Sequence, residues 1–534
     1  MFPAIITQLA LSYSISSTAS YLAIVLGVTG ITGVMGWRWW KRKQTYHSLN
    51  VLPSPPKHWL LGNLPQVLAA VKEKKFFQLL FDWAQQLGPM YVYWIGQPVI
   101  ILSKPKVIED TIINGMRDGS LVRSQRTSNA WNDISGPILL GQQGAEWQWR
   151  RRTWNPEFTA GSLSKYVEMI NQACMQVIES LQETTPAKQV QVDPLFVELT
   201  MRVISCLMLG TPVDRKSPSP EGPALNTRKV YEAMSVVSYR FLRVATGEKR
   251  WMKYLPTQAS RDYWAARRYL EKFLTPRVDL ALQLREKKQP DLGPEISPLF
   301  QESMLVKIAA KEPKYTRETL VAEVIELLLA GTDTTAHTLS FAVGELALNP
   351  CVFQQAQSIV DQTWRRYGAI NTESLKELNY IRAIVKETLR LYSVASGSTS
   401  LEAQRDILVE GVVVPRGAKL FWSTLGAGRD PEVYPRPDQF LPERWLEQGK
   451  ANNPPPMIDF GSGYHRCLGE HLAMLEATVM LAQLLRCFHW ELVNGRSSLE
   501  ELQQNLLIYP SDGMPLRFRL RELELENLKA EGVA

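Results

Sequence analysis

Cysteine is scarce in this chain, and its few cysteines are scattered. The 534 residues include five of them, and no two stand at the C-x-x-C spacing. An odd number of isolated cysteines predicts neither a disulfide framework nor a zinc-binding knuckle, and it places the folded part in a reducing compartment. A lone cysteine is most often a small buried residue, so any chemical role has to be indicated by its neighbours.

A strong charge of either sign is also missing. The 60 Lys and Arg residues against 53 Asp and Glu residues leave a net charge of +7, a mild bias in a chain of this length. No basic stripe interleaved with aromatic residues occurs, so nucleic acid is not expected as a partner. An acidic protein or an anionic membrane surface fits the bias better. Residues 64–520 contain no repeat or low-complexity tract, and 45% hydrophobic content suffices for a large core.

Charged residues are absent from the first 37 positions. Within them, residues 17–36 read STASYLAIVLGVTGITGVMG, a stretch long enough to span a bilayer as a helix. The next segment, WRWWKRK at residues 37–43, combines basic and tryptophan side chains, which is typical of the cytoplasmic end of a membrane helix. Residues 1–45 are therefore predicted to be an N-terminal transmembrane anchor that leaves the rest of the chain on the cytoplasmic side.

A cleaved signal peptide is the alternative interpretation, but such a peptide carries its positive charge before the apolar run and not after it. This asymmetry favours an uncleaved anchor, in the endoplasmic reticulum of a eukaryote or in the plasma or internal membrane of a bacterium. Prolines mark residues 46–63 as a stiff linker. Residues 64–520 are then expected to form a single large domain, followed by a tail at residues 521–534.

Apolar residues recur at three- and four-residue spacing through several long segments, whereas β-rich pieces are short and few. The predicted helices cover residues 160–184, 256–286, 316–348, 351–367, 380–392 and 469–487. The predicted strands lie within residues 90–103, 407–417 and 419–424. The expected fold class is therefore mainly α with minor β-sheets.

The predicted helix over 316–348 is apolar on more than one face, and yet its middle reads AGTDTT. Thr316 suits an N-cap, but glycine followed by short polar residues is poor material for a helix interior. One interpretation is a kink in which threonine hydroxyls bond to carbonyls one turn earlier. The other is a proton relay, in which Asp333 exchanges protons with solvent while the Thr334 hydroxyl donates into a cavity. The helix alone does not decide between them.

A shared carboxylate is predicted to join a helix to a loop. The segment KETLRL places Glu387 and Arg390 at i and i+3, on one helical face. Such a pair is usually a weak surface salt bridge. The proline-marked stretch FLPERWL supplies a second guanidinium, that of Arg444, and a carboxylate held by two guanidinium groups is a strong contact. Glu387, Arg390 and Arg444 are therefore expected to form a structural ion-pair network.

A glycine-bearing loop, FGSGYHRCLG at residues 460–469, surrounds Cys467. With the other motifs in their order along the chain, it resembles the cytochrome P-450 family of haem-thiolate monooxygenases. The loop is similar to the family's F-x-x-G-x-R-x-C-x-G, KETLR to its E-x-x-R, PERW to its P-E-R-F, AGTDTT to its A/G-G-x-D/E-T-T, and EWQWRRR to its W-x-x-x-R. The resemblance covers about residues 50–520.

The resemblance implies the cytochrome P-450 fold, a catalytic role for the large domain and a haem b cofactor. Cys467 is then the thiolate ligand of the iron, whose electron donation favours O–O cleavage. Gly463 and Gly469 would let the backbone approach closely where a side chain would collide. Phe460 would screen the sulfur from water.

The two haem propionates require cationic or hydrogen-bond-donating partners. By resemblance these are Trp147, Arg151 and His465, the last of which stands where many family members have arginine. The family's arginine in the strand after E-x-x-R has no counterpart here, since Ser400 and Leu401 occupy that place. One propionate contact is therefore left unassigned by the sequence.

The implied activity is insertion of one oxygen atom from O₂ into a lipophilic small molecule, with Asp333 and Thr334 delivering protons. Electrons would come from an NADPH-dependent flavoprotein reductase or from a ferredoxin, docked on Arg150, Arg152 and Arg466. The rival functions are a partner-independent lyase or isomerase acting on a peroxide, and a non-catalytic haem sensor; neither needs a proton relay. The segments expected to face the substrate are residues 118–138, 228–262, 393–400 and 508–516, with the middle of the long helix.

Overall fold

The computed structural model describes residues 25–521 apart from positions 28, 30–32, 34–35, 38–39, 185–187, 213–220, 288–295, 397–399 and 447–456. Most of the predicted membrane anchor therefore lies outside the described residues. Among the helices that are described, none combines the length and the apolar character that crossing a bilayer requires.

Helices make up most of the described chain. The α-helices are α3 (Leu64–Lys72), α4 (Phe76–Leu87), α5 (Pro105–Arg117), α6 (Gln125–Ser135), α7 (Gly144–Trp154), α8 (Ala160–Ser164), α9 (Val167–Thr184), α10 (Val192–Leu209), α11 (Thr227–Ala245), α12 (Gln258–Lys287), α13 (Pro298–Gln301), α14 (Met304–Lys311), α15 (Arg317–Leu348), α16 (Pro350–Tyr367), α17 (Asn379–Tyr392), α18 (Thr424–Gly428), α19 (Glu470–Cys487) and α20 (Ser497–Glu500). Short 3-10 helices are η1 (His47–Val51), η2 (Leu139–Gly141), η3 (Asn155–Phe158), η4 (Arg250–Tyr254), η5 (Ser374–Lys376), η6 (Pro442–Trp445) and η8 (Gly463–His465).

The predicted helices agree with the observed ones to within two residues at each end, with one exception. A turn at residues 165–166 divides the segment predicted as a single helix over 160–184 into α8 and α9.

The strands are short and form small sheets. They are β1 (Met90–Trp94), β2 (Pro98–Leu102), β3 (Leu121–Arg123), β4 (Gln189–Gln191), β5 (Leu401–Ala403), β6 (Ile407–Val409), β7 (Val412–Val414), β8 (Lys419–Trp422), β9 (Phe488–Leu492), β10 (Leu502–Gln504), β11 (Ile508–Pro510) and β12 (Pro515–Leu520). The largest sheet has the order β1-β2-β8-β5-β3, in which only β2 and β8 run parallel. The other sheets are β4-β12-β9 and the hairpins β6-β7 and β10-β11. The expected fold class, mainly α with minor β-sheets, is confirmed.

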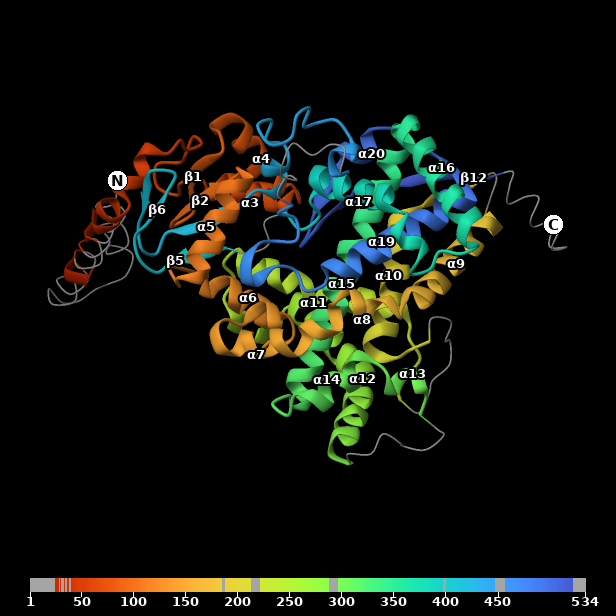
Figure 1. Ribbon diagram of the computed structural model, residues 1–534. Coiled ribbons are helices and arrows are strands. Elements are labelled where there is room, and N and C mark those ends of the chain that lie inside the picture. The colour runs from red at the N-terminus through yellow and green to blue at the C-terminus, as the bar shows by residue number, and fades with distance from the viewer. Residues whose placement is uncertain are drawn as a thin grey trace.

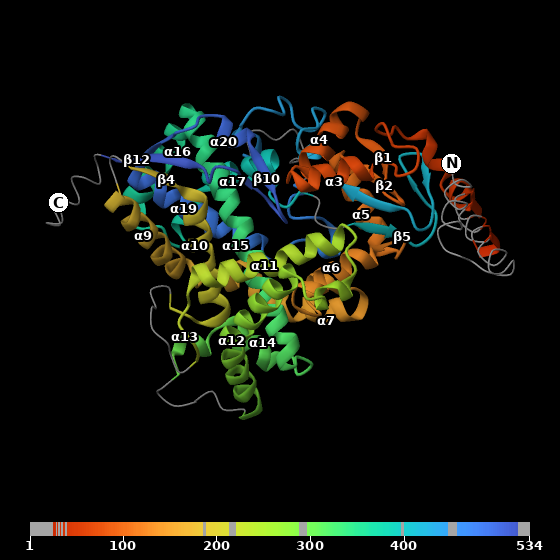
Figure 2. The same cartoon turned by 180° about the vertical axis from the view of Figure 1, so that it is seen from behind.

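The sheet that contains β1, β2 and β5 lies at the N-terminal end of the molecule, and helices fill the rest (Figure 1). Helix α15 runs through the middle of the structure in both views (Figure 2). Helices α10, α17 and α19 pack against it. Nearly all of its apolar side chains are buried, because it is covered on several faces.

Helix α15 begins at a capping box, in which the Thr316 and Thr319 side chains bond to each other's backbone N–H groups. The helix continues through AGTDTT without interruption. The Thr332 hydroxyl donates to the Leu328 carbonyl and the Thr334 hydroxyl to the Ala330 carbonyl, each over 2.7 Å. These bonds within the preceding turn satisfy the hydroxyls, so the polar stretch remains helical inside the core.

The three residues expected to form an ion-pair network lie together where α17 meets η6. Glu387 is 0% exposed, and its carboxylate accepts bonds of 2.9 Å from Arg390 Nε and 2.7 Å from Arg390 Nη2. Arg444 Nε donates to the same carboxylate over 3.0 Å, and Trp445 Nε1 over 2.9 Å. The bidentate pair with Arg390 lies within α17, and the bonds from Arg444 and Trp445 link that helix to η6, which precedes the cysteine loop in the chain.

Candidate active site

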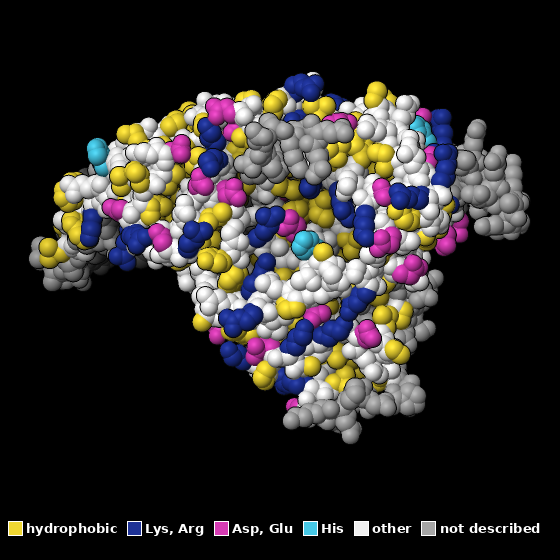
Figure 3. Space-filling view, in the orientation of Figure 1, with side chains coloured by type: hydrophobic (Ala, Val, Ile, Leu, Met, Phe, Trp, Pro, Cys, Tyr) yellow, Lys and Arg dark blue, Asp and Glu magenta, His cyan; other side chains and the backbone are white. Residues whose placement is uncertain are grey.

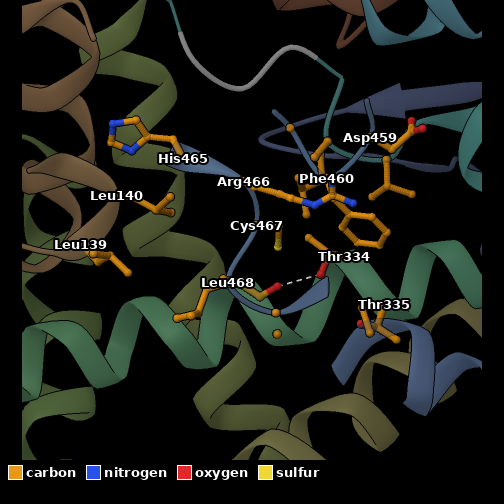
Figure 4. Close-up of a pocket in the computed structure, with 18 of the residues that line it drawn as sticks. Leu139, Leu140, Thr334, Thr335, Asp459, Phe460, His465, Arg466, Cys467 and Leu468 are labelled. Carbon is orange, nitrogen blue, oxygen red and sulfur yellow. Dashed lines mark hydrogen bonds between the residues drawn. The ribbon is translucent and has the colours of Figure 1, made fainter. Parts of the chain in front are cut away.

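A cavity of about 310 Å³ lies between α15 and the loop that precedes α19. Most of the residues predicted for the site line it, namely Trp147, Arg151, Thr334, Phe460, His465, Cys467 and Gly469. Figure 4 shows Thr334, Phe460, His465 and Cys467 among them. Asp333 and Gly463 lie beside the cavity without lining it. Residues far apart in the sequence are thus brought to one internal space, which is the condition for a shared cofactor or substrate site.

The loop around Cys467 is folded by glycines. Gly461 has φ +74° and Gly463 has φ +65°, a backbone conformation that glycine adopts without strain. The Cys467 N–H donates to the Phe460 carbonyl over 2.7 Å, which closes the loop. A Cβ on Gly469 would meet no described atom within 4 Å, so packing within the described chain gives no reason for glycine there.

Cys467 lies deep inside the protein, and its accessible surface faces the cavity, whereas Cys174, Cys206 and Cys487 are buried among packed side chains. Figure 4 shows its sulfur directed from the loop toward α15. Burial raises the pKa of the Cys467 thiol, and this effect is opposed by hydrogen bonds from backbone N–H groups of residues 469 and 470 and by the Arg151 charge. A metal ion bound there would displace the thiol proton and hold the thiolate.

One wall of the cavity presents hydrogen-bond donors and positive charge. Trp147 and Arg151 stand one turn apart on α7, and the Trp147 ring lies 4.2 Å from the His465 ring, centroid to centroid. Burial, with the nearby charges of Arg123 and Arg151, lowers the pKa of His465 to about 3. His465 is therefore neutral at pH 7 and acts as a hydrogen-bond partner and not as a cation.

Arg123 also belongs to this wall of the cavity, although it was not among the residues predicted from the sequence. Its Nη1 donates to the Leu140 carbonyl, its Nη2 lies 3.3 Å from His465 Nδ1, and it is 4% exposed. In the pairing of β3 with β5, Arg123 stands opposite Leu401. β3 thus supplies an arginine beside Leu401, the position on β5 where this chain lacks the family's arginine. No motif marks Arg123, so only knowledge of the strand pairing would have found it.

Asp333 and Thr334 point in different directions from α15. Thr334 lines the cavity, whereas the Asp333 carboxyl faces Tyr231, which hydrogen-bonds it, and lies near His337. Asp333 Oδ1 is buried and has no hydrogen-bond partner in the described part of the chain. Burial raises the pKa of Asp333, an effect partly opposed by the His337 charge and the Tyr231 hydrogen bond. The carboxyl therefore holds its proton to a higher pH than an exposed aspartate does.

The remaining lining is mostly apolar, although it also includes polar residues such as Glu326, Thr338 and Asp459. It includes Trp131, Ile134 and Ile138 from α6 and its end, Ile204 from α10, Leu327, Leu329 and Ala330 from α15, and Val394, Ala395, Leu506 and Leu507 from loops. Two of the segments expected to face the substrate, residues 118–138 and 393–400, contribute to it. The other two, residues 228–262 and 508–516, contribute no lining residue among those described.

Arg150 does not belong to an exposed dock, contrary to the sequence-based expectation. Its side chain is 4% exposed, and its Nε lies 3.1 Å from Glu323 Oε1 on α15. The helical geometry explains the difference: Arg150 points from α7 into the protein, while its neighbour Arg152 remains exposed. Arg466 is also exposed and pairs with Glu470.

The residues around the cavity fit a haem group. Arg123 Nε is buried and has no hydrogen-bond partner among the described residues, so this wall has unused capacity to bind an anion. An accessible thiol in the same cavity is a suitable ligand for iron. Haem b is an iron porphyrin whose ring carries two carboxylate groups. Its iron would be held by Cys467, and its carboxylates would lie against Arg123, Arg151, Trp147 and His465.

Comparison with known proteins adds an independent line of evidence. The family model described as cytochrome P-450 matches residues 52–517. Cytochrome P-450 3A12 of Canis lupus familiaris is 25% identical over 446 residues, which cover 82% of this chain and 85% of the relative. The 2-hydroxyisoflavanone synthase of Glycyrrhiza echinata is 24% identical over 475 residues, covering 85% and 87%. Each relative matches over most of its length, and the residues matched by the family model include all those that line the cavity.

Proposed function

Because the chain belongs to the cytochrome P-450 monooxygenase family, with a haem-thiolate cofactor, we propose that it inserts one oxygen atom from O₂ into a lipophilic small molecule bound in the cavity between Cys467 and Thr334. The observation that carries this proposal is that an accessible cysteine and the Thr334 hydroxyl line the same, largely apolar space. The balanced reaction uses one substrate C–H bond, O₂, two electrons and two protons, and it yields an alcohol and water.

We assign the haem contacts as follows. Cys467 would hold the iron as a thiolate, and Phe460, whose carbonyl accepts the Cys467 N–H, would cover the sulfur. Arg123 and Arg151 would bind the propionates by charge, assisted by the Trp147 and His465 N–H groups. When bound, the haem supplies the iron at which O₂ is activated, and the thiolate supports cleavage of the O–O bond.

The chain's own residues handle the protons. Asp333 holds a proton because it is buried, and Tyr231 and His337 lie next to it. The Thr334 hydroxyl oxygen faces the cavity while its proton is donated to the Ala330 carbonyl. Rotation about the Thr334 side-chain bond redirects that proton into the cavity. Asp333 is the neighbouring acid that would replace it, once its carboxyl turns from Tyr231 toward Thr334. The apolar lining excludes water that would otherwise deliver protons without control.

Electrons must come from a protein, either a flavoprotein reductase or a ferredoxin. Both are acidic partners in this proposal, and both would dock where Arg152 and Arg466 are exposed. Figure 3 shows Lys and Arg side chains spread over the face on which α7 and α8 lie. Attraction between this basic face and an acidic partner would speed their association, and added salt would slow it. The membrane-anchored location, with this domain on the cytoplasmic side, belongs to the same proposal and rests on residues 1–45.

The test is turnover of a panel of lipophilic compounds with isotopically labelled O₂ and a reductase. The proposal predicts one labelled oxygen atom in the product and no product without the electron donor. Thr334→Ala should retain haem but release hydrogen peroxide in place of much of the product. Thr338→Ala, which changes a neighbouring cavity-lining threonine, serves as the matched control. Rearrangement or cleavage of an organic peroxide substrate without any donor, with no oxygenated product from the other compounds, would instead establish a lyase or isomerase.

A further inference from the structure

A stripe of polar side chains runs along a face of α15 that does not line the cavity. Asp333, His337 and Ser340 stand at positions i, i+4 and i+7, so they lie on one side of the helix. None of the three lines the cavity, whereas Thr334 and Thr338 do. His337, which is 5% exposed, is therefore a second buried titratable group beside Asp333, and it lies outside the substrate space.

His337 is held by an aspartate from another helix. Its Nδ1 lies 2.7 Å from Oδ1 of Asp193, at the start of α10. The Ser340 hydroxyl donates to the same oxygen over 2.8 Å. A carboxylate accepts hydrogen bonds but does not donate them, so Nδ1 carries the proton of this pair. No hydrogen bond joins Nε2 to another group in the described part of the chain, which leaves this nitrogen as the one that exchanges a proton.

Acidic and phenolic groups surround the imidazole. Asp333 lies one turn earlier on the same helix, and Tyr231 of α11 hydrogen-bonds that carboxyl. The Tyr509 ring of β11 lies 5.7 Å from the His337 ring, centroid to centroid. Burial lowers the pKa of His337, but the charge and hydrogen bond of Asp193 and the charge of Asp333 outweigh it and raise the pKa above its ordinary value. His337 therefore stays protonated to a higher pH than an exposed histidine does.

The Tyr509 side of the imidazole leads to the protein surface. Tyr509 is half-buried, and its hydroxyl accepts from the exposed Lys74 Nζ over 3.2 Å and donates to Gln503 Oε1 over 3.0 Å. The Asp193 side chain is 11% exposed, so this pair is not sealed from solvent. His337 thus lies between the enclosed Asp333 carboxyl and polar groups at the surface.

We propose that His337 acts through Asp333: it returns a proton to that carboxylate each time the carboxyl gives one to Thr334. This inference rests on the proposed monooxygenase function and names the source of its protons. Side chains four residues apart on a helix can meet. In the step, the Nε2–H bond of the imidazolium breaks, an O–H bond forms on Asp333, and the neutral imidazole keeps its Nδ1–H on Asp193. Solvent then restores the Nε2 proton, so protons arrive from the α10 side of α15 and not through the cavity.

The experiment measures product and hydrogen peroxide formed per electron pair by full-length, haem-loaded protein, with a turned-over compound of the panel. The range is about pH 6 to pH 9, which brackets a histidine of raised pKa. Wild type should lose product to peroxide as pH rises, because the imidazolium gives up its proton to solvent. His337→Gln should form about tenfold less product per electron pair at pH 7 and show little dependence on pH. This effect is smaller than that of a general acid at the reacting atoms, about 100-fold or more, because water partly replaces a distant donor.

Two further variants separate the proton from the fold. Asp193→Asn keeps the imidazole but removes the charge that raises its pKa, so the loss of product should begin at a lower pH than in wild type. Ser340→Ala removes an uncharged partner of the same carboxylate. It is the matched control and should retain the wild-type pH profile.

A second measurement does not depend on turnover. NMR of protein labelled at its six histidines should show one imidazole that titrates above the ordinary range of about pH 6.5. This signal should vanish in His337→Gln and titrate at a lower pH in Asp193→Asn. If His337→Gln fails to fold, the comparison of wild type with Asp193→Asn still decides.

Two results would overturn the inference: a His337→Gln variant that keeps the wild-type pH profile of product, or a labelled imidazole that titrates alike in wild type and Asp193→Asn. Failure of the proposed function is recognised separately. Protein without a thiolate-bound haem would lack the carbon monoxide band described below, whatever the histidine titration shows.

Discussion

At the scale of single residues, Arg123 shows how a side chain on one strand supplies a contact missing from another. It is buried, it stands opposite Leu401, and its Nε has no partner among the described residues. Arg123→Leu is predicted to lower the haem content of purified protein and to speed haem transfer to apomyoglobin severalfold, whereas Arg123→Lys, which keeps the charge, should be intermediate. Unchanged haem retention in Arg123→Leu would remove Arg123 from the propionate site.

Asp459 carries a prediction about pH. It lines the cavity and hydrogen-bonds Ser393, and burial raises its pKa to about 7. Unfolded aspartate has a pKa of about 4, so at pH 5 to 7 the folded state holds more protons than the unfolded state. The free energy of unfolding should therefore fall as pH rises through this window, by up to about 1.4 kcal/mol per pH unit.

Asp459→Asn isolates this effect, because the amide does not titrate. Melting temperatures of wild type and variant should be compared from pH 5 to pH 7. The account predicts that the variant gains stability relative to wild type as pH rises. A difference between the two proteins that stays constant with pH would show that Asp459 does not keep its proton in the folded state.

At the scale of elements, Glu387 joins α17 to η6, the 3-10 helix that precedes the cysteine loop in the chain. Its partner Arg390 is 1% exposed, so loss of the carboxylate leaves a buried, uncompensated charge. Glu387→Ala is predicted to destabilise the protein by about 3–5 kcal/mol or to prevent haem incorporation. Urea unfolding followed by tryptophan fluorescence measures this change.

Glu373→Ala provides the control for that measurement, since Glu373 forms an exposed i,i+3 pair with Lys376. Its loss should cost less than about 1 kcal/mol. Equal effects of the two substitutions would contradict the structural role given to Glu387.

The elements also show which parts of the structure a sequence reveals. Helices such as α15 and α19 were predictable because apolar periodicity and capping residues are local signals. The cysteine loop was recognisable because its glycines and Cys467 are contiguous. Arg123 was not found, because its role depends on β5, a strand that is distant in sequence. Arg150 was misplaced because sequence does not tell which face of α7 points inward.

At the scale of the whole molecule, the predicted anchor precedes a domain that has its own core. Deletion of residues 1–45 should move most of the protein from the membrane pellet to the soluble fraction, because the longest uncharged apolar stretch is removed. Trp59 and Leu60, 85% and 68% exposed, remain in the truncated protein. If the truncated protein pellets as before, residues 1–45 are not the main attachment, and Trp59→Ser with Leu60→Ser tests whether this pair is.

The central claim is that Cys467 holds a haem iron through its sulfur. The most direct test is the absorption spectrum of the dithionite-reduced, full-length protein before and after addition of carbon monoxide, with Cys467→Ser as the comparison. The account predicts a strongly red-shifted Soret band in wild type and its loss in the variant. A wild-type band typical of histidine-ligated haem, or no haem band at all, would contradict thiolate ligation and the proposed monooxygenase function with it.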